Sequence, residues 1–266
     1  MVNFISPKAA GVLETSGGSA SPLIITNVSK AFGRLQALDG ISLSLTHGER
    51  RALIGPNGAG KTTLFHVISG ILAPSSGKIL IFGQDASRLP VHRRAALGVA
   101  RTFQITNLLP TLSVLENILL SLQAQEPYRF VIHWPMASFG SLFLRAREIL
   151  KTWGLWDWRN TEVRSLSYGE QRELEIVMAL AQRPKLLLLD EPTSGLSPSE
   201  TASVTRMVRN LPRDVTIFLI EHDMDVVFEL AERISVLHLG RLVAEGSTEE
   251  IRQDRAVQQI YLGNHV

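Results

Sequence analysis

The chain has 266 residues, enough for one or two domains with a packed core. Its 27 Lys and Arg stand against 25 Asp and Glu, a balance that argues against a nucleic-acid-binding protein built on bulk positive charge. Hydrophobic residues at 45% and charged residues at 20% are near globular averages and exclude disordered, collagen-like and coiled-coil chains. Because the sequence has no cysteine, disulfides, thiol catalysis and thiolate metal sites are also excluded.

The first 22 residues differ in composition from the rest of the chain. They contain many Gly and Ser, and they lack the basic start and long apolar stretch of a signal peptide. Elsewhere no apolar run approaches the roughly 20 residues that span a bilayer. We therefore expect residues 1–22 to form a flexible N-terminal extension and residues 23–266 to form a single soluble domain.

Strands and helices are expected to alternate along most of the chain. Short apolar runs bounded by turn residues predict strands at residues 23–25, 41–45, 52–54 and 79–82. Helical patterns occupy residues 61–69, closed by Gly70, and then 170–182 and 198–210, the last with Pro198 in its first turn. Residues 186–189 and 215–220 are apolar almost throughout, as strands buried on both faces of a parallel sheet must be. The pattern predicts an α/β fold, interrupted by a mostly helical section at residues 105–166.

The segment after the strand expected at residues 52–54 matches the phosphate-binding pattern G-x-x-x-x-G-K-[ST]. Its glycines let successive backbone N–H groups converge on phosphate oxygens, and the helix that follows adds its positive N-terminus. Lys61 would bring a full charge to the β- and γ-phosphates, and Thr62 a hydroxyl ligand for Mg²⁺. A Gly-rich turn is the alternative, and it accounts for neither the preceding strand nor the following helix. The predicted nucleotide contacts in this segment are Gly55, Pro56, Asn57, Gly58, Ala59, Gly60, Lys61, Thr62 and Thr63.

Two acids, Asp190 and Glu191, follow the apolar run at residues 186–189. Ionised carboxylates at a buried strand end are costly unless they meet a cation, and Mg²⁺ beside Asp190 would supply one. Glu191 would then polarise the water that attacks the γ-phosphorus. The alternative is a solvated junction between a strand and a loop.

Residues 166–171, with the sequence L-S-Y-G-E-Q, resemble the signature motif of ATP-binding cassette proteins. The usual L-S-G-G-Q is altered at its first glycine, where Tyr168 stands. The phosphate-loop lysine, Gln104, the two acids and His222 follow the order and spacing of that family, so that the resemblance covers residues 23–262.

The resemblance implies an architecture. It predicts a P-loop NTPase (RecA-like) core with a parallel sheet, an N-terminal antiparallel β subdomain and an inserted α-helical subdomain. The β subdomain and core would comprise residues 23–104 and 172–246, the helical and signature subdomain residues 105–171, and a C-terminal tail residues 247–266.

The resemblance also implies roles for single residues. Phe32 would stack on adenine, Gln104 would sense the γ-phosphate and Mg²⁺, and His222 would contact the γ-phosphate as a switch. The signature residues would close the nucleotide from a second subunit, and they are Ser167, Gly169 and Glu170. The residues that bind Mg²⁺ would be Thr62, Gln104 and Asp190.

For some of these residues, a structural role that involves no nucleotide remains open. Phe32 is equally well explained as a core aromatic, and a lone histidine such as His222 is more often structural. Glu221, its neighbour, would form a hydrogen bond or face solvent. Ser197 stands where many cassettes carry Asp in the loop that joins the two subunits, which puts a carboxylate contact there in doubt.

Residues 98–104, 114–117, 221–224 and 257–263 look like those of the ATP-binding subunits of branched-chain and other hydrophobic amino-acid importers. Cassettes for urea-type uptake share much of this. The implied partners are two transmembrane permease subunits, a second identical or related ATP-binding subunit, and indirectly an extracytoplasmic substrate-binding protein. The implied location is the cytoplasmic face of the bacterial inner membrane. Rival hypotheses are a soluble cassette acting on nucleic acid or ribosomes, and a nucleotide kinase, in which the signature segment has no role.

The apolar residues after Gln104 predict where a membrane subunit docks. A cytoplasmic loop helix of that subunit would lie in a groove bordered by residues 104–109 and the helical region after them. Cysteines placed at Asn107 or Leu108 are therefore expected to crosslink to it.

Overall fold

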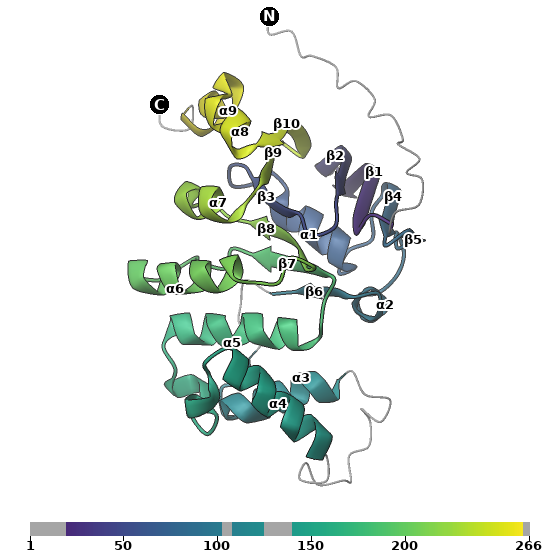
Figure 1. Cartoon of the computed structure of the whole chain (residues 1–266). Helices are drawn as coiled ribbons and strands as arrows, with labels where there is room; N and C mark the ends of the chain where they lie inside the picture. The colour runs from purple at the N-terminus through teal and green to yellow at the C-terminus, as the bar shows by residue number, and fades with distance from the viewer. Residues whose placement is uncertain (1–19, 103–107, 125–139, 263–266) are drawn as a thin grey trace, which may run out of the picture.

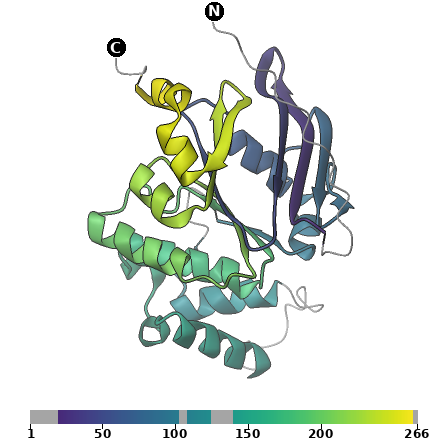
Figure 2. The same cartoon turned by 45° about the horizontal axis from the view of Figure 1, so that its top comes forward.

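The computed structural model of this chain describes residues 20–102, 108–124 and 140–262. Two β-sheets and their covering helices form one body, and a group of helices forms the end of the molecule opposite α8 (Thr248–Gln253) and α9 (Arg255–Leu262) (Figures 1 and 2). Within the described ranges, no helix is both long and apolar enough to cross a bilayer.

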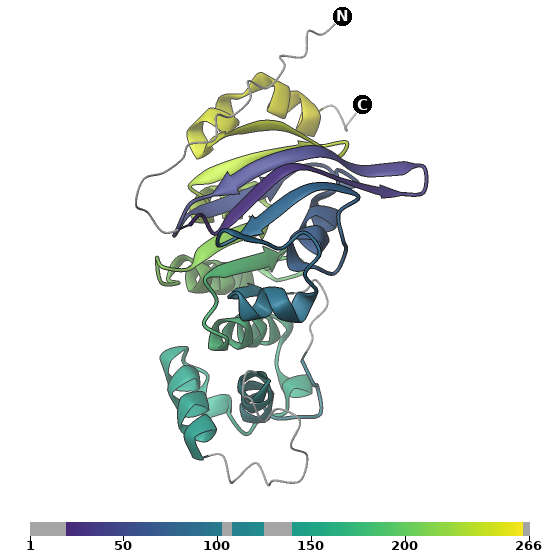
Figure 3. The ribbon, with the colours of Figure 1, turned by 90° about the vertical axis from the view of Figure 1, so that its right-hand side faces the viewer.

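The first sheet is antiparallel, with the strand order β2-β1-β4-β5. Its strands are β1 (Leu23–Phe32), β2 (Leu35–Leu45), β4 (Ser76–Ile81) and β5 (Gln84–Asp85). Leu23 pairs with Leu45 on one side and Ile81 on the other, and all three are fully buried. The hairpin of β1 and β2 projects beyond the body of the sheet (Figure 3).

The second sheet has the strand order β10-β9-β3-β8-β7-β6. Five of its strands are parallel, namely β3 (Arg50–Ile54), β6 (Val99–Arg101), β7 (Leu186–Asp190), β8 (Thr216–Ile220) and β9 (Arg233–His238). The last strand, β10 (Arg241–Ser247), pairs antiparallel with β9. Every residue of β3, β7 and β8 is buried, which explains the nearly continuous apolar sequences of β7 and β8. The first two residues of β3, Arg50 and Arg51, are buried with hydrogen-bond and ion-pair partners.

Helices cover both faces of this second sheet. Helix α1 (Lys61–Ser69) packs Leu64 and Phe65 between the two sheets, and it ends at Gly70, which has the left-handed conformation expected of a helix stop. On the other face lie α5 (Tyr168–Ala181), α6 (Pro198–Arg209) and α7 (Met224–Leu230), whose apolar sides share a second core with β7 and β8. A short helix, α2 (Val91–Ala96), precedes β6.

The helical end is built from α3 (Val114–Gln123), α4 (Gly140–Thr152) and two short 3-10 turns, η2 (Trp156–Trp158) and η3 (Val163–Ser165). It packs against the start of α5 through its own core, which includes Ile118, Leu150 and Leu174. Leu108 is buried in the same core.

The predicted α/β class is confirmed, together with the parallel core, the antiparallel sheet and the helical insertion. Helices α1, α5 and α6 begin and end within two residues of their predicted bounds. Strands β1 and β2 are longer than predicted, because their outer halves form the exposed hairpin and lack a continuous apolar pattern. Strands β6, β9 and β10 were not predicted; β6 has three residues, and exposed and half-buried residues alternate along much of β10.

Candidate functional site

The ends of three neighbouring strands bring the predicted site together. Strands β3, β8 and β7 are adjacent and parallel, so their carboxyl ends lie at one edge of the sheet. The phosphate loop follows β3, Glu221 and His222 follow β8, and Asp190 ends β7 with Glu191 directly after it. This edge is where open α/β sheets bind ligands.

The phosphate loop has a backbone that only glycine allows at two positions. Gly55 has a φ of 152°, and a Cβ there would lie 2.1 Å from the carbonyl oxygen of Leu237. Gly60 has a φ of 105°, and its Cβ would lie 2.6 Å from the carbonyl oxygen of Ala37. The loop therefore packs against neighbouring backbone too closely for any side chain at these two positions, and it leads directly into the N-terminus of α1.

Lys61 closes this loop in the structure. Its Nζ donates to the carbonyl oxygens of Gly55 at 2.6 Å and Pro56 at 3.1 Å, and the residue is buried. Burial lowers the pKa of Lys61, while the charges of Glu191 and Asp190 act in the opposite direction. The lysine and both acids thus share one electrostatic environment, as a nucleotide phosphate site requires.

The other loop residues differ in exposure. Asn57 and Gly58 are exposed at the tip, Ala59 is buried, and Pro56, Gly60, Thr62 and Thr63 are half-buried. The hydroxyl residues Thr62 and Thr63 lie in the first turn of α1, directly after the loop.

Asp190 has an ion pair that the sequence did not reveal. Its Oδ2 lies 2.6 Å from Nη2 of Arg101 on the neighbouring strand β6, and both side chains are almost fully buried. The guanidinium also donates to Ser69 Oγ at 3.1 Å and lies over the ring of Phe65. Among the described residues, the second oxygen, Oδ1, is buried and has no hydrogen-bond partner. An oxygen of this kind fits a hydrated divalent cation, and together with Thr62 it makes the residues present compatible with Mg²⁺.

Glu191 begins a tight turn in an unusual conformation. Its φ of 46° lies in the left-handed region, which residues other than glycine rarely adopt. Its N–H donates to the carbonyl oxygen of Ile220 at 3.0 Å, and its own carbonyl oxygen accepts from the N–H of Ser194 at 3.2 Å. The residue is half-buried, so that its side chain retains access to solvent.

Glu221, for which a hydrogen bond and a solvated position were both open, is fully buried and hydrogen-bonded. Its Oε1 accepts from the N–H and the hydroxyl of Thr193, at 3.0 and 2.6 Å, and its Oε2 accepts from the N–H of His222 at 3.1 Å. His222 is exposed, with Nδ1 3.9 Å from the same Oε2. An exposed imidazole at this edge can reach a phosphate.

The signature residues lie at the start of α5. Ser167 is the N-cap and forms a capping box with Glu170, whose Oε2 accepts from the N–H of Ser167 at 2.7 Å. The N–H of Gly169 donates to Oε1 of Glu200 on α6 at 3.0 Å. No hydrogen bond or ion pair between described residues joins Ser167 or Gly169 to the phosphate loop of the same chain.

Glu200 ties α6 to the signature. Its Oε2 accepts from the N–H of Ser197 at 3.0 Å and from its hydroxyl at 2.7 Å, in addition to the contact with Gly169. These donors, led by the Ser197 hydroxyl, lower the pKa of Glu200 to about 2. Ser197, which replaces the usual Asp, is therefore the N-cap of α6.

Phe32 lies on the first, antiparallel sheet and not on the sheet that forms this edge. Phe32 ends β1 with 45% of its surface exposed and Lys30 Nζ 5.2 Å from its ring centre, so an aromatic face is available at the hairpin. Gln104 lies outside the described residues, as do residues 105–107 and Gly263, the last residue of the 257–263 segment.

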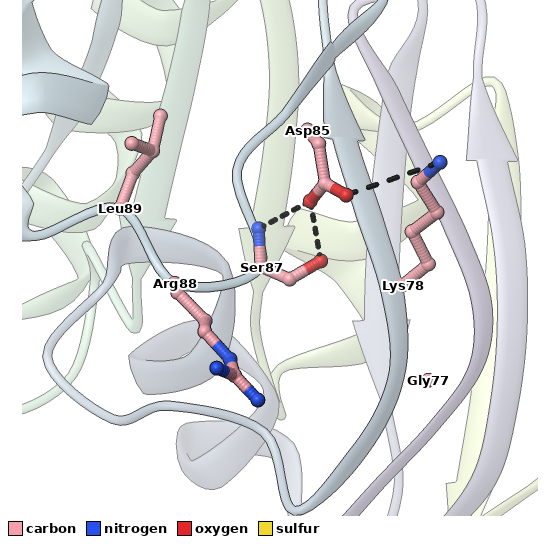
Figure 4. A pocket seen from close by; sticks show the side chains of 6 residues that line it. All are labelled: Gly77, Lys78, Asp85, Ser87, Arg88 and Leu89. Atoms are coloured by element: carbon pink, nitrogen blue, oxygen red, sulfur yellow. Dashed lines mark hydrogen bonds and ion pairs between the residues drawn. The ribbon is translucent and has the colours of Figure 1, made fainter.

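A surface hollow on the antiparallel sheet holds none of the predicted site residues. It is lined by Gly77, Lys78, Asp85, Ser87, Arg88 and Leu89 (Figure 4). In it, Asp85 accepts hydrogen bonds from the N–H and hydroxyl of Ser87 and lies 3.9 Å from Lys78 Nζ. The hollow is separate from the phosphate loop.

Four residues of the site were not assigned from sequence, namely Arg101, Thr193, Glu200 and Glu221. The contacts that bring them to the site join residues 28 to 89 positions apart along the chain. A local motif, the S-x-x-E capping box, marks Glu200 alone, and it does not indicate the contact with Gly169. The signal available in the sequence was charge. Arg101 is an arginine in a buried strand, Glu221 directly follows an apolar segment, and Glu200 lies near one.

A family model described as "ABC transporter" matches residues 38–194. A second, described as "Branched-chain amino acid ATP-binding cassette transporter", matches residues 241–266.

Curated relatives are similar over nearly their whole length. The high-affinity branched-chain amino acid transport ATP-binding protein LivG of Escherichia coli K12 is 37% identical over 254 residues, covering 92% of this chain and 99% of LivG. Its counterpart BraF of Pseudomonas aeruginosa is 35% identical over 248 residues, covering 91% and 97%. The structure of the ADP conformation of MJ1267, an ATP-binding cassette of an ABC transporter, has a TM-score of 0.82 at 30% identity and covers 92% of this chain and 100% of that one. These matches confirm the predicted P-loop NTPase fold.

Proposed function

This chain belongs to the ABC transporter family, and we propose that its ATP hydrolysis powers the uptake of branched-chain or other hydrophobic amino acids through separate transmembrane subunits. The ATPase part rests on one observation above all: the strand order places the phosphate loop with Lys61, and Asp190 with Glu191, at the same edge of the parallel sheet. The amino-acid part is supported by the family match at residues 241–266 and by the two relatives, whose names state branched-chain amino acid transport.

Each predicted site residue has a role in this proposal. Lys61 leaves its carbonyl partners and pairs with the β- and γ-phosphates, while the N–H groups of the phosphate loop and of the α1 start surround the phosphate oxygens. Thr62, Gln104 and Asp190 hold Mg²⁺, which when bound neutralises phosphate charge. Glu191 accepts the proton of the attacking water and His222 contacts the γ-phosphate. Phe32 stacks on the adenine ring.

The signature supports a nucleotide site shared by two chains. Ser167 and Gly169 carry the hydroxyl and N–H donors that suit a γ-phosphate, yet they make no contact with the phosphate loop of their own chain. We infer that they close the site of a second ATP-binding subunit, identical or related. Glu170 shapes this surface from within, through the capping box.

The remaining partners follow from the transport role. Two permease subunits would form the path through the membrane, and an extracytoplasmic binding protein would deliver the substrate to them. The chain would work at the cytoplasmic face of the bacterial inner membrane.

The docking site for the permease needs one correction. Leu108 is 8% exposed and belongs to the core of the helical end, so a cysteine there would not reach a partner. Leu109 is 48% exposed and is the better position. We expect the Leu109→Cys variant to crosslink to a permease loop with a yield that changes on adding ATP, and Arg252→Cys to give no crosslink. Equal yields would remove this docking site.

Reconstitution tests the function as a whole. The chain, purified with its membrane subunits in proteoliposomes and supplied with the substrate-binding protein, should support uptake of radiolabelled leucine with ATP. The Glu191→Gln variant should abolish uptake while the complex stays assembled. ATPase activity that responds to DNA or ribosomes and not to the membrane subunits would contradict the proposal.

A further inference from the structure

We propose that Glu221 is a positioning residue that holds the base Glu191 in place through Thr193. The inference rests on the proposed role of Glu191 in hydrolysis. It starts from an observation about the turn at residues 191–194: its first residue is hydrogen-bonded to Ile220, the last residue of β8, and its third residue to Glu221, which follows directly.

The turn has a reason to need such support. Glu191 has a φ of 46°, and the left-handed region is disfavoured for residues with a Cβ. Strained backbone of this kind persists only where the surroundings over-determine it. A small rotation at this residue would displace its carboxylate, since the side chain stems directly from the strained Cα.

The first tie acts on the backbone of Glu191 itself. Its N–H donates to the carbonyl oxygen of Ile220 at 3.0 Å, which extends the pairing of β7 with β8 by one residue beyond Asp190. This bond sets the position of the residue but leaves the rest of the turn free to move.

The second tie comes from the carboxylate of Glu221. It accepts both the N–H and the hydroxyl of Thr193, at 3.0 and 2.6 Å, and a carboxylate acceptor makes such bonds stronger than neutral ones. Thr193 and Glu221 are both buried, so water does not compete for them. With Ile220 holding the first residue of the turn and Glu221 the third, the conformation of Glu191 is fixed from both sides.

Glu221 also accepts from the N–H of His222, so a change at Glu221 would disturb two predicted catalytic residues at once. Thr193 separates the two effects, because its hydroxyl belongs only to the turn. The variant Thr193→Val keeps the shape of the side chain and removes the 2.6 Å bond.

The test is steady-state ATP hydrolysis by the full chain with its membrane subunits. Thr193→Val should lower kcat about tenfold and leave the KM for ATP within about twofold of wild type, because no phosphate-binding residue is touched. Thr193→Ser, which keeps the hydroxyl, should restore kcat. In a Glu191→Gln background, Thr193→Val should lower the residual rate no further. The hydrogen bond from Thr193 to Glu221 is proposed to act on the rate only through the carboxylate of Glu191, which this background lacks.

A matched control is available on β8, the strand that ends at Ile220. Thr216 begins β8 and is fully buried, with its hydroxyl accepting from the N–H of Gly48 at 3.1 Å at the opposite edge of the sheet. Thr216→Val should lower the melting temperature as Thr193→Val does, and leave kcat unchanged.

The outcomes separate this inference from the proposed function. Wild-type kcat in Thr193→Val, equal loss of kcat in Thr216→Val, or a further loss in the Glu191→Gln background would overturn the positioning role. Normal turnover in Glu191→Gln alone would instead overturn the assignment of the base, whatever the threonine variants do.

Discussion

Arg101 Nη2 lies 2.6 Å from Oδ2 of Asp190, and the two side chains are 5% and 1% exposed. The pair joins β6, the strand that leads toward Gln104, to β7, the strand that ends at the two acids. An ionised carboxylate buried this deeply needs a cation, and the arginine supplies it from one side while Oδ1 is left for Mg²⁺. Arg101 therefore holds the Asp190 carboxylate in place before any nucleotide arrives.

Replacing Arg101 by Met should destabilise the protein by about 3–5 kcal/mol, because it leaves the Asp190 carboxylate buried without its partner. Urea unfolding measures this loss. Arg209→Met is the control, since Arg209 and Glu229 form a surface pair at 3.3 Å whose side chains are 64% and 46% exposed. Its removal should cost less than about 1 kcal/mol. Similar losses in the two variants would show that the Asp190 pair contributes little.

Glu191→Gln keeps the size and hydrogen bonding of the side chain and removes the base. Turnover of ATP should fall by about 10²–10⁴-fold while ATP still binds, and a stable ATP-bound dimer should accumulate. Size-exclusion chromatography with ATP detects the dimer, and Glu162→Gln, at an exposed carboxylate paired with Arg164, serves as control. Near-normal turnover would rule out the assigned role.

Lys61→Ala should fail at an earlier step. The lost contact with phosphate is charge-assisted and exists in the bound ground state, so ATP affinity should fall by at least about tenfold. Fluorescent-nucleotide titration measures it. Lys185→Ala removes a lysine that lies over the ring of Phe82, outside the predicted site, and should leave affinity unchanged. Normal affinity in Lys61→Ala would count against the phosphate-loop assignment.

The parts of the site that could be predicted are those encoded in contiguous sequence. The loop at residues 55–62 is specified by its glycines and lysine, and β7 and β8 by apolar runs that only a doubly covered sheet requires. The order of the strands then places the loop and the acids at one edge.

The parts that could not be predicted depend on which strands and helices become neighbours. Thr193 and Glu221 are 28 residues apart, and Gly169 and Glu200 are 31 apart; each pair meets only because its two elements pack together. Neither residue type nor local spacing distinguishes such an acid from one that faces solvent. The same holds for Arg101, whose partner lies 89 residues away.

Stability in acid should depend on Glu200. Hydrogen bonds from Ser197 and Gly169 lower its pKa to about 2 in the folded chain, from an ordinary value of 4.5. Because the unfolded chain takes up the proton first, the contribution of Glu200 is complete above about pH 5 and is lost as pH falls from 4.5 toward 2. Glu200→Gln should therefore flatten the fall in stability across that window.

The measurement is urea unfolding of wild type and variant between about pH 3 and pH 6. Glu116→Gln is the matched control, since Glu116 is held in a similar capping box by Ser113 but has no counterpart of the Gly169 contact. Glu116→Gln should change the dependence of the unfolding free energy on pH less than Glu200→Gln does. An equal effect of the two variants would mean that the hydrogen bond from Gly169 to Glu200 does not contribute to the pH dependence of stability.

The composite site predicts that two inactive variants rescue each other. Lys61→Ala disables the phosphate loop and Ser167→Arg places a bulky charge at the signature, so each should be inactive alone. If a site takes its loop from one chain and its signature from the other, a mixed dimer has one site with both lesions and one with neither.

ATPase activity should then return in part when the two variants are mixed, provided that the chain self-associates. The control places both lesions in one chain and mixes it with wild type: each site of that mixed dimer has one lesion, so only residual wild-type dimers should hydrolyse ATP. A site contained within one chain predicts the reverse, because every chain in the first mixture carries a lesion and half the chains in the second carry none. An inactive first mixture, together with activity in the second beyond that of its residual wild-type dimers, would therefore assign the signature to its own chain's nucleotide. That result would contradict the inference drawn from the signature residues, which share no hydrogen bond with the phosphate loop among the described residues.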